Sequence, residues 1–327
     1  MMTFRALAPG LCVAVALAVV AALLGARWPV VGAPIFAIAA GIAARGALGR
    51  IGPLEPGVAF ASKKMLQFGI VLLGFGINLT VLWQAGRASA TVLIGSLLVG
   101  MAGGLLLGRL MRVGFNIRLL VAAGTSICGA SAIAALAPII AAEAGEVAFA
   151  TATIFLYNMV AVFLFPAIGH ALHLSDSTFG IWAGTAINDT SSVLAAGYAY
   201  APAAGQIATI VKLARALAIL PLAVGVALYV AGRSSGSSGR FDFVAAMPWF
   251  VAFFVAAAGI ASTGIVPAGV LAALAVAGRY IMIVAFAGVG LSSDFARLRT
   301  VGATPLLLGA LVWALVAVSS LAIQGAL

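Results

Sequence analysis

The sequence predicts an all-α polytopic membrane protein of about eleven transmembrane helices, with inverted repeats and broken helices. Composition supports the membrane prediction. Charged residues make up only 7% of the 327 residues, against about 25% in soluble globular chains, and hydrophobic residues make up 65%. The apolar runs are continuous, as from Leu11 to Leu24, whereas the strands of a membrane β-barrel alternate in polarity. Soluble enzymes, disordered chains and disulfide scaffolds are therefore excluded.

Each predicted helix is an apolar run of about 20 residues, the length that crosses the hydrocarbon core of a bilayer. The first run begins at Ala6 and is longer than the apolar part of a signal peptide. We expect a single transmembrane domain, 1–327, with halves of about 1–171 and 176–327 and a Ser/Gly loop at 232–239. The predicted spans are 6–24, 30–48, 59–80, 88–108, 117–142, 146–169, 176–200, 203–231, 243–261, 265–291 and 301–325.

The arginines predict the orientation of these spans. Alternate loops place most arginines on one side, which the positive-inside rule makes cytoplasmic, so that the N-terminus is cytoplasmic and the C-terminus outside. The net charge of +10 is scattered over short loops without an aromatic-lined basic stripe, which excludes nucleic acid as a partner. The cytoplasmic arginines are Arg5, Arg45, Arg50, Arg109, Arg112, Arg118, Arg233, Arg240, Arg297 and Arg299, and the outer ones are Arg27 and Arg87.

Two pairs of segments resemble each other. The segment from Gly74 aligns with the segment from Ala287, pairing Gly76 with Gly290, on helices that the topology makes antiparallel. Such an inverted repeat is typical of secondary transporters, and chance similarity between Gly- and Leu-rich helices is the alternative. GTSICGASAI (124–133) also resembles GTAINDTSSV (184–193). The predicted count gives this second pair the same direction, so either the count is wrong or the two segments converged on similar helix-breaking chemistry.

The charged side chains of Asp189, Lys212 and Arg215 fall within long apolar segments of the predicted spans. Each costs about 2.5–3.5 kcal/mol at the centre of a membrane helix. Lys212 and Arg215 are three residues apart and therefore share one helix face. We expect all three to face one water-accessible cavity inside the bundle, where opposite charges offset one another. The alternatives are an ion pair that only orders the bundle and long side chains that reach the membrane surface.

The segments 124–131 and 184–192 are rich in Gly, Thr, Ser and Asn, which suit a helix interior poorly. We expect broken helices there, whose free backbone N–H groups and helix dipoles favour an anion. Close packing through small residues is the alternative. Asp189 is the candidate for binding a coupling ion, H⁺ or Na⁺. The substrate-binding candidates are Thr125, Ser126, Cys128, Gly129, Ser131, Asn188, Thr190, Ser191, Ser192, Lys212 and Arg215.

Four further polar residues are secondary candidates: Asn78, Tyr157, Asn158 and Ser292. Tyr157 and Asn158 either line a pathway or bond to a neighbouring helix. Asn78 and Ser292 close the repeated turn, where capping is a sufficient role. The motif H-E-x-x-H and the P-loop are absent from the sequence, so we expect neither an enzyme nor a cofactor. The two histidines lack further ligands, so no metal site is expected.

Six segments carry a resemblance to a known family: QFGIVLLGFGINLT (67–80), GTSICGASAIAALAPII (124–140), FLFPAI (163–168), GTAINDTSSVLAAG (184–197), VKLARALAILP (211–221) and GVGLSSDFARLR (288–299). They resemble the YeiH-like sulfate exporter family of bacterial inner-membrane proteins, which is related to the bile acid/sodium symporter-type fold. The resemblance implies two inverted five-helix repeats, crossing broken helices and a homodimer. Family members carry His before the acid where this chain has Asn188 before Asp189, which weakens the case for proton coupling.

The leading hypothesis is a secondary transporter that exports a small anion, of the sulfate or organosulfur type, by alternating access. The anion would lie between the N-termini of broken helices and the charges of Lys212 and Arg215. A second hypothesis is a sodium- or proton-coupled carrier of an organic anion, in which Asp189 binds the cation. A third is a channel or a non-transporting membrane sensor. Saturable flux that is stimulated by counter-transport indicates a carrier, whereas conductance indicates a channel.

Overall fold

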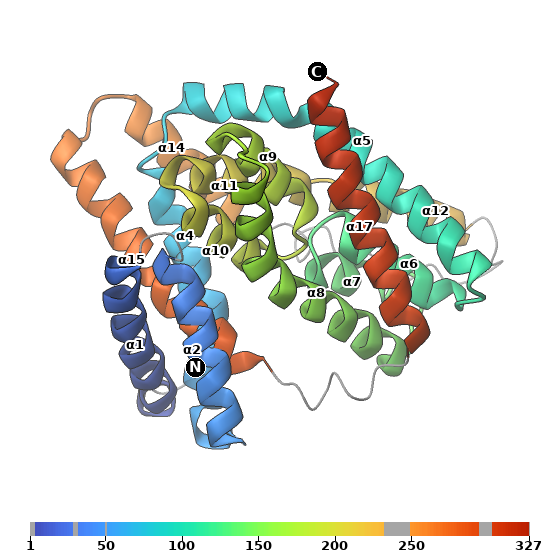
Figure 1. Cartoon of the computed structure of the whole chain (residues 1–327), viewed down its shortest axis with the longest axis horizontal. Coiled ribbons are helices and arrows are strands. Elements are labelled where there is room, and N and C mark those ends of the chain that lie inside the picture. The colour runs from blue at the N-terminus through green and yellow to red at the C-terminus, as the bar shows by residue number, and fades with distance from the viewer. Residues whose placement is uncertain (1–3, 29–31, 50, 232–248, 294–302, 327) are drawn as a thin grey trace. The chain divides into compact units, whose positions relative to one another are not determined.

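The computed structural model describes residues 4–28, 32–49, 51–231, 249–293 and 303–326, which contain helices and no β-strand (Figure 1). Outside the described residues lie the Ser/Gly loop 232–239 and Arg50, Arg233, Arg240, Arg297 and Arg299. The α-helices are α1 (Phe4–Arg27), α2 (Gly32–Leu48), α3 (Glu55–Ala59), α4 (Leu66–Gly74), α5 (Leu79–Leu110), α6 (Phe115–Ser126), α7 (Ala130–Leu136), α8 (Ala144–Ala171), α9 (Asp176–Ala186), α10 (Thr190–Tyr200), α11 (Pro202–Ala216), α12 (Ile219–Ala231), α14 (Trp249–Ser262), α15 (Ala268–Ser292) and α17 (Ala303–Gly325). A 3₁₀ turn, η1 (Gly52–Leu54), and a π-helical turn, η2 (Phe60–Met65), complete the described helices.

Within the described part of the chain, seven helical segments are long and apolar enough to cross a membrane. The shorter helices α2 and α14 are apolar as well. Large apolar side chains point outward from these helices, for example Leu98 at 62% and Leu228 at 69% exposure, which suits contact with lipid rather than water. The prediction of a polytopic helical membrane protein is confirmed.

The chain forms two compact units, each built from separate stretches of sequence. Unit 1 comprises Met1–Gln84, Ala195–Gln206 and Trp249–Phe295, and unit 2 comprises Ala85–Leu194, Ile207–Pro248 and Ala296–Leu327. The candidate residues on the broken segments, on α8 and on α11 all belong to unit 2. The secondary candidates on the repeated turn belong to unit 1.

In unit 1, helices α4 and α15 pack against each other in opposite directions. Gly69 packs against Met282, and Gly76, further along the chain, packs against Ala275. Before α4, the hydroxyl oxygen of Ser62 lies 3.4 Å from that of Ser292 near the end of α15. As residue numbers rise along α4, the residues of α15 that they contact have falling numbers. The helices of the first resemblance are therefore antiparallel, as predicted.

The neighbours of these two helices in unit 1 follow the same inverted pattern. Helix α2 crosses α15 where Gly41 meets Gly290, and α14 crosses α4 where Gly74 meets Phe254. Without a side chain, each glycine lets a backbone approach closely. In the chain, α2 precedes α4 and α14 precedes α15. Each repeated helix therefore packs against the helix that precedes the other repeated helix, as expected for an inverted repeat.

In unit 2, helix α5 packs against both α6 and α17 through its glycines. Gly95 meets Ile323 and Gly108 meets Leu308, so α17 runs opposite to α5. Gly100 likewise meets Ser126, and Gly108 also meets Arg118, so α6 runs opposite to α5 too. Helices α6 and α17 therefore share a direction.

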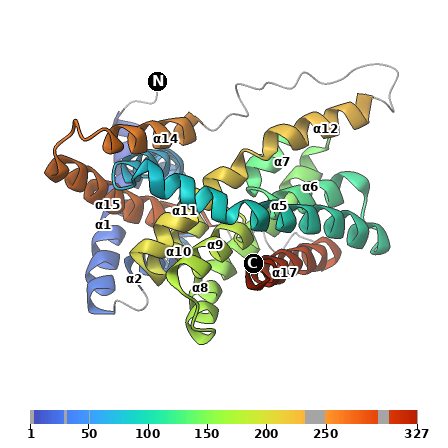
Figure 2. The same cartoon turned by 90° about the horizontal axis from the view of Figure 1, so that it is seen from above.

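Helices α6 and α8 of unit 2 also run in the same direction. The side chain of Asn116 donates a hydrogen bond to Glu146 (2.8 Å), and eight residues further along each helix Gly124 meets Ile154. The segment between them must therefore return to its starting side, and α7 does so, with Ile133 packed against Gly124. Figures 1 and 2 show α6 and α7 side by side. The prediction of one full crossing at 117–142 is wrong, because the segment is a re-entrant hairpin.

Helix α9 runs opposite to α17, since the indole N–H of Trp182 donates to Ala317 O (2.9 Å) and that of Trp313 donates to Ala186 O (3.1 Å). It therefore runs opposite to α6 as well. The expectation that the two segments of the second resemblance share a direction is wrong. The error arises because the re-entrant hairpin does not cross the membrane, so that one fewer crossing separates the two segments.

Candidate functional site

Both broken helices of unit 2 lie where the sequence predicted them. Helix α6 ends at Ser126 and α7 begins at Ala130, whereas α9 ends at Ala186 and α10 begins at Thr190. The first break needs Gly129, whose φ of +65° disfavours any residue with a side chain. The N–H of Gly129 bonds back to Gly124 O (2.8 Å) and so satisfies one carbonyl at the end of α6.

Lys212 of α11 connects the two breaks. Its ammonium donates hydrogen bonds to Ile127 O (2.8 Å) and Ile187 O (2.9 Å), and its exposure is 0%. Both carbonyls follow the last turn of a helix, where the helix dipole is negative and favours a cation. The sequence hypothesis placed an anion between helix N-termini and the charge of Lys212, and the structure shows that the ammonium itself lies at two helix C-termini.

Helix α11 reaches the breaks because it packs closely on α9. A side chain at Gly184 would lie 2.7 Å from Cβ of Val211, closer than real Cβ atoms approach one another. The glycine therefore permits the contact that places Lys212, the next residue on α11, against the end of α9.

Arg215 lies one turn further along α11 and is 2% exposed. Its Nε–H donates to Ser126 O (2.6 Å), another carbonyl at the end of α6. Both terminal nitrogens, Nη1 and Nη2, are buried and have no hydrogen-bond partner among the described residues. Burying guanidinium donors without acceptors costs free energy, and a bound ligand with acceptor atoms would offset this cost.

Asp189 has a local role that the sequence hypothesis did not assign. Its carboxylate accepts the N–H of Ser191 (2.9 Å) and the Ser191 hydroxyl, which caps the start of α10. The side-chain oxygen of Asn158 accepts the N–H groups of Asn188 (3.1 Å) and Asp189 (3.0 Å). The sequence hypothesis expected an anion to accept backbone N–H groups at this break, but the side chains of Asp189 and Asn158 accept three of them.

The sequence predicted one water-accessible cavity shared by the three charged residues, and the structure shows no hydrogen bond between these described side chains. Among the described residues, the contacts of Lys212 and Arg215 are with backbone carbonyls, and those of Asp189 are with Ser191. The two cations are shut off from solvent, whereas Asp189 is half-buried. Cys128 directly follows Ile127, the residue whose carbonyl oxygen accepts a hydrogen bond from Lys212.

The remaining polar candidates of the broken segments differ in burial. Ser126 and Asn188 are buried, and the hydroxyl of the first and the amide oxygen of the second have no partner in the described part of the chain. Ser131 is exposed on α7 and Thr190 is half-buried. The other buried candidates are Thr125, Cys128, Gly129, Ser191 and Ser192.

The secondary candidates have structural contacts. The hydroxyl of Tyr157 donates to Leu306 O (2.7 Å), and its ring lies 5.3 Å from that of Trp313, which ties α8 to α17. Asn78 accepts the N–H of Thr80 (2.8 Å) and caps α5, and Ser292 donates to Gly288 O (2.9 Å). These contacts match the simpler roles that the sequence left open.

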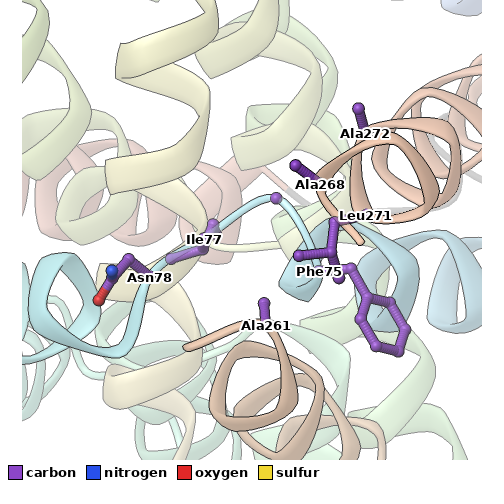
Figure 3. A pocket seen from close by; sticks show the side chains of 8 residues that line it. Phe75, Ile77, Asn78, Ala261, Ala268, Leu271 and Ala272 are labelled. Carbon is purple, nitrogen blue, oxygen red and sulfur yellow. The ribbon is translucent and has the colours of Figure 1, made fainter. Parts of the chain in front are cut away.

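A pocket in unit 1 does not contain the charged candidates (Figure 3). Its lining is apolar apart from Asn78, whose side-chain oxygen already caps α5. The other lining residues are Phe75, Gly76, Ile77, Ala261, Ala268, Leu271 and Ala272.

The backbone carbonyls of Ser126, Ile127 and Ile187 were missed by reasoning from side chains. Every residue carries a carbonyl, so composition cannot reveal which ones a cation will bind. The usable signal was the pair of helix breaks, because each break leaves free carbonyls on its N-terminal side as well as free N–H groups on its C-terminal side.

Comparisons with known proteins agree with a membrane protein. The model of the family described as conserved hypothetical protein 698 matches residues 9–309. A UPF0324 membrane protein of Streptococcus pyogenes serotype M18 is 40% identical over 326 residues, which cover 97% of this chain and 96% of the relative. UPF0324 membrane proteins of Clostridium tetani and Fusobacterium nucleatum are 33% identical over 308 residues and 35% identical over 321 residues. These alignments cover 90% and 92% of this chain, and 89% and 92% of the relatives.

Proposed function

The chain belongs to the conserved hypothetical protein 698 family of membrane proteins, and from the geometry of its site we propose that it is a secondary transporter of a small anion. In this proposal the protein works by alternating access, in which the substrate site opens in turn to each side of the membrane. The broken helices fit this function, because interrupted spans supply substrate sites near the middle of the membrane in many transporters.

One observation carries the proposal: two cations, Lys212 and Arg215, are buried at the helix breaks with carbonyl partners and without an acidic partner among the described residues. A helix C-terminus carries about half a negative charge, so the two helix ends offset only part of the two full positive charges. A small anion beside Arg215 would supply the remaining negative charge and accept the free guanidinium hydrogens.

The kind of anion and the coupling ion are part of the same proposal. The resemblance of six segments to YeiH-like sulfate exporters favours export of sulfate or an organosulfur anion. Asp189 is the candidate for coupling transport to H⁺ or Na⁺, because it is a half-buried carboxylate beside the break of α9. We place the protein in the bacterial inner membrane as a homodimer, with the N-terminus cytoplasmic and the C-terminus outside.

The test is uptake of radiolabelled sulfate, thiosulfate, methanesulfonate and acetate into liposomes that contain the purified protein. We expect uptake that saturates with concentration for at least one of these anions. Arg215→Gln should abolish it, whereas Arg87→Gln, at an exposed arginine, should leave it unchanged. Uptake by the wild-type protein equal to that of empty liposomes for every anion would contradict the proposed function.

A further inference from the structure

We infer that the outer edge of the Arg215 guanidinium binds the substrate, that the substrate is an oxyanion presenting two oxygen atoms to this edge, and that Lys212 holds the broken helices together. The inference rests on the proposed function, since it names the ligand group of the same site. It goes further by dividing the two cations into a binding residue and a positioning residue.

The hydrogen bonds of the two side chains carry this division. Lys212 directs its ammonium at Ile127 O and Ile187 O, and so joins the ends of α6 and α9, which approach from opposite directions. Arg215 uses only Nε for the backbone, at Ser126 O. Its Nη1 and Nη2, which carry four of the five guanidinium hydrogens, have no acceptor in the described part of the chain.

The shape of the guanidinium selects the ligand class. Its hydrogens form a rigid planar fork that matches two oxygens of a carboxylate, sulfate or sulfonate, whereas a halide offers a single acceptor atom.

Cys128 provides a reporter at this position. Its side chain is 6% exposed, and the residue directly follows Ile127, whose carbonyl oxygen binds Lys212. The other cysteine, Cys12, is exposed on α1, so Cys12→Ala leaves a single thiol, at the break between α6 and α7. An oxyanion bound to Arg215 should slow the reaction of this thiol with N-ethylmaleimide.

The main experiment measures thermal unfolding of the purified full-length protein in detergent, titrated with sodium sulfate, methanesulfonate, acetate or chloride at equal ionic strength. We expect at least one oxyanion, and not chloride, to raise the unfolding temperature. Arg215→Lys keeps the charge but loses the fork, so it should weaken the apparent affinity at least tenfold. Lys212→Met should lower the unfolding temperature without ligand and weaken affinity less than Arg215→Lys does. The control Arg87→Lys should match the wild type.

The outcomes separate this inference from the proposed function. If the wild type shows neither an anion-dependent shift nor flux in liposomes, the proposed function itself fails. If the wild type binds an oxyanion and Arg215→Lys binds it equally well, the inference is overturned while the function stands.

If Arg215→Lys does not fold, the Cys12→Ala protein decides. Slower alkylation of Cys128 in the oxyanion but not in chloride supports the site. An unchanged rate at an oxyanion concentration that saturates uptake overturns it.

Discussion

At the scale of single residues, burying Lys212 and Arg215 is possible because helix ends supply their partners. Three carbonyls at two helix C-termini accept their hydrogen bonds, at distances of 2.6–2.9 Å. The sequence predicted correctly that these side chains face the interior, since exposing a charge to lipid in an apolar span is costly. It did not predict the partners, because Asp189 was the visible opposite charge and backbone acceptors leave no mark in a sequence.

Replacing Lys212 should reveal its role as a link between helices. Lys212→Met keeps most of the side-chain length but leaves Ile127 O and Ile187 O without their donor. Each lost hydrogen bond to a charged group is worth about 1.5–3 kcal/mol, although removing a buried charge offsets part of this loss. We expect a lower unfolding temperature in a detergent thermal melt, and no change for Lys64→Met, at an exposed lysine. A variant as stable as the wild type would show that the two contacts do not stabilise the fold.

Replacing Asp189 should separate capping from ion coupling. Asp189→Asn keeps a side-chain oxygen for the N–H of Ser191, so the start of α10 should remain capped. If the carboxylate binds the coupling ion, flux per folded protein should lose its dependence on pH or sodium while the affinity for the anion changes little. Transport across a matrix of pH and sodium concentrations checks this, and an ion dependence identical to that of the wild type would leave Asp189 with its capping role alone.

At the scale of elements, the main feature is the re-entrant hairpin of α6 and α7. The sequence predicts the break, because Gly, Ser and Thr interrupt an apolar run there. It could not show that the chain turns back, because two short arms have the same total length and apolar content as one full crossing. Helix α6 has 12 residues and α7 has 7, and only the contacts of α6 with α8 reveal the direction.

The turn of this hairpin depends on Gly129. An added methyl group at a φ of +65° costs about 1–2 kcal/mol, so Gly129→Ala should lower the unfolding temperature and reduce transport. Gly225→Ala is the matched control, since Gly225 lies inside α12 with open space around it and alanine favours a helix by about 1 kcal/mol. The control should be as stable as the wild type or more so. Equal stability of Gly129→Ala and wild type would contradict this account of the turn.

Surface labelling of single cysteines tests the hairpin in a membrane. Gly114→Cys and Ala142→Cys flank α6 and α7, and in a Cys12→Ala background both should react with an impermeant thiol reagent from the same side. We expect α9 and α10 to form a second re-entrant hairpin, which enters the membrane from the other side because α9 runs opposite to α6. Ser177→Cys and Ala203→Cys should therefore both be labelled from that other side. Labelling of the first pair from opposite faces would show a full crossing.

At the scale of the whole chain, both sequence resemblances join antiparallel helices. Helices α4 and α15 are inverted within unit 1, and α6 and α9 are inverted within unit 2. The arginine pattern did not reveal the re-entrant segment. The loops 142–146 and 170–175 carry neither Lys nor Arg, so treating 117–142 and 176–200 both as re-entrant leaves every arginine on its predicted side. A charge rule alone therefore cannot distinguish the two topologies.

We propose that the protein carries an anion by alternating access, and counter-transport in liposomes can check this proposal. Liposomes containing the protein are preloaded with the unlabelled anion that stabilises it most in the thermal melt, and entry of the labelled anion is followed from outside. We predict that labelled anion enters several times faster than it enters liposomes without internal anion, because a carrier returns faster when loaded. We also predict no conductance in a planar bilayer. Entry that is independent of internal anion, together with a measurable conductance, would contradict the claim and identify a channel.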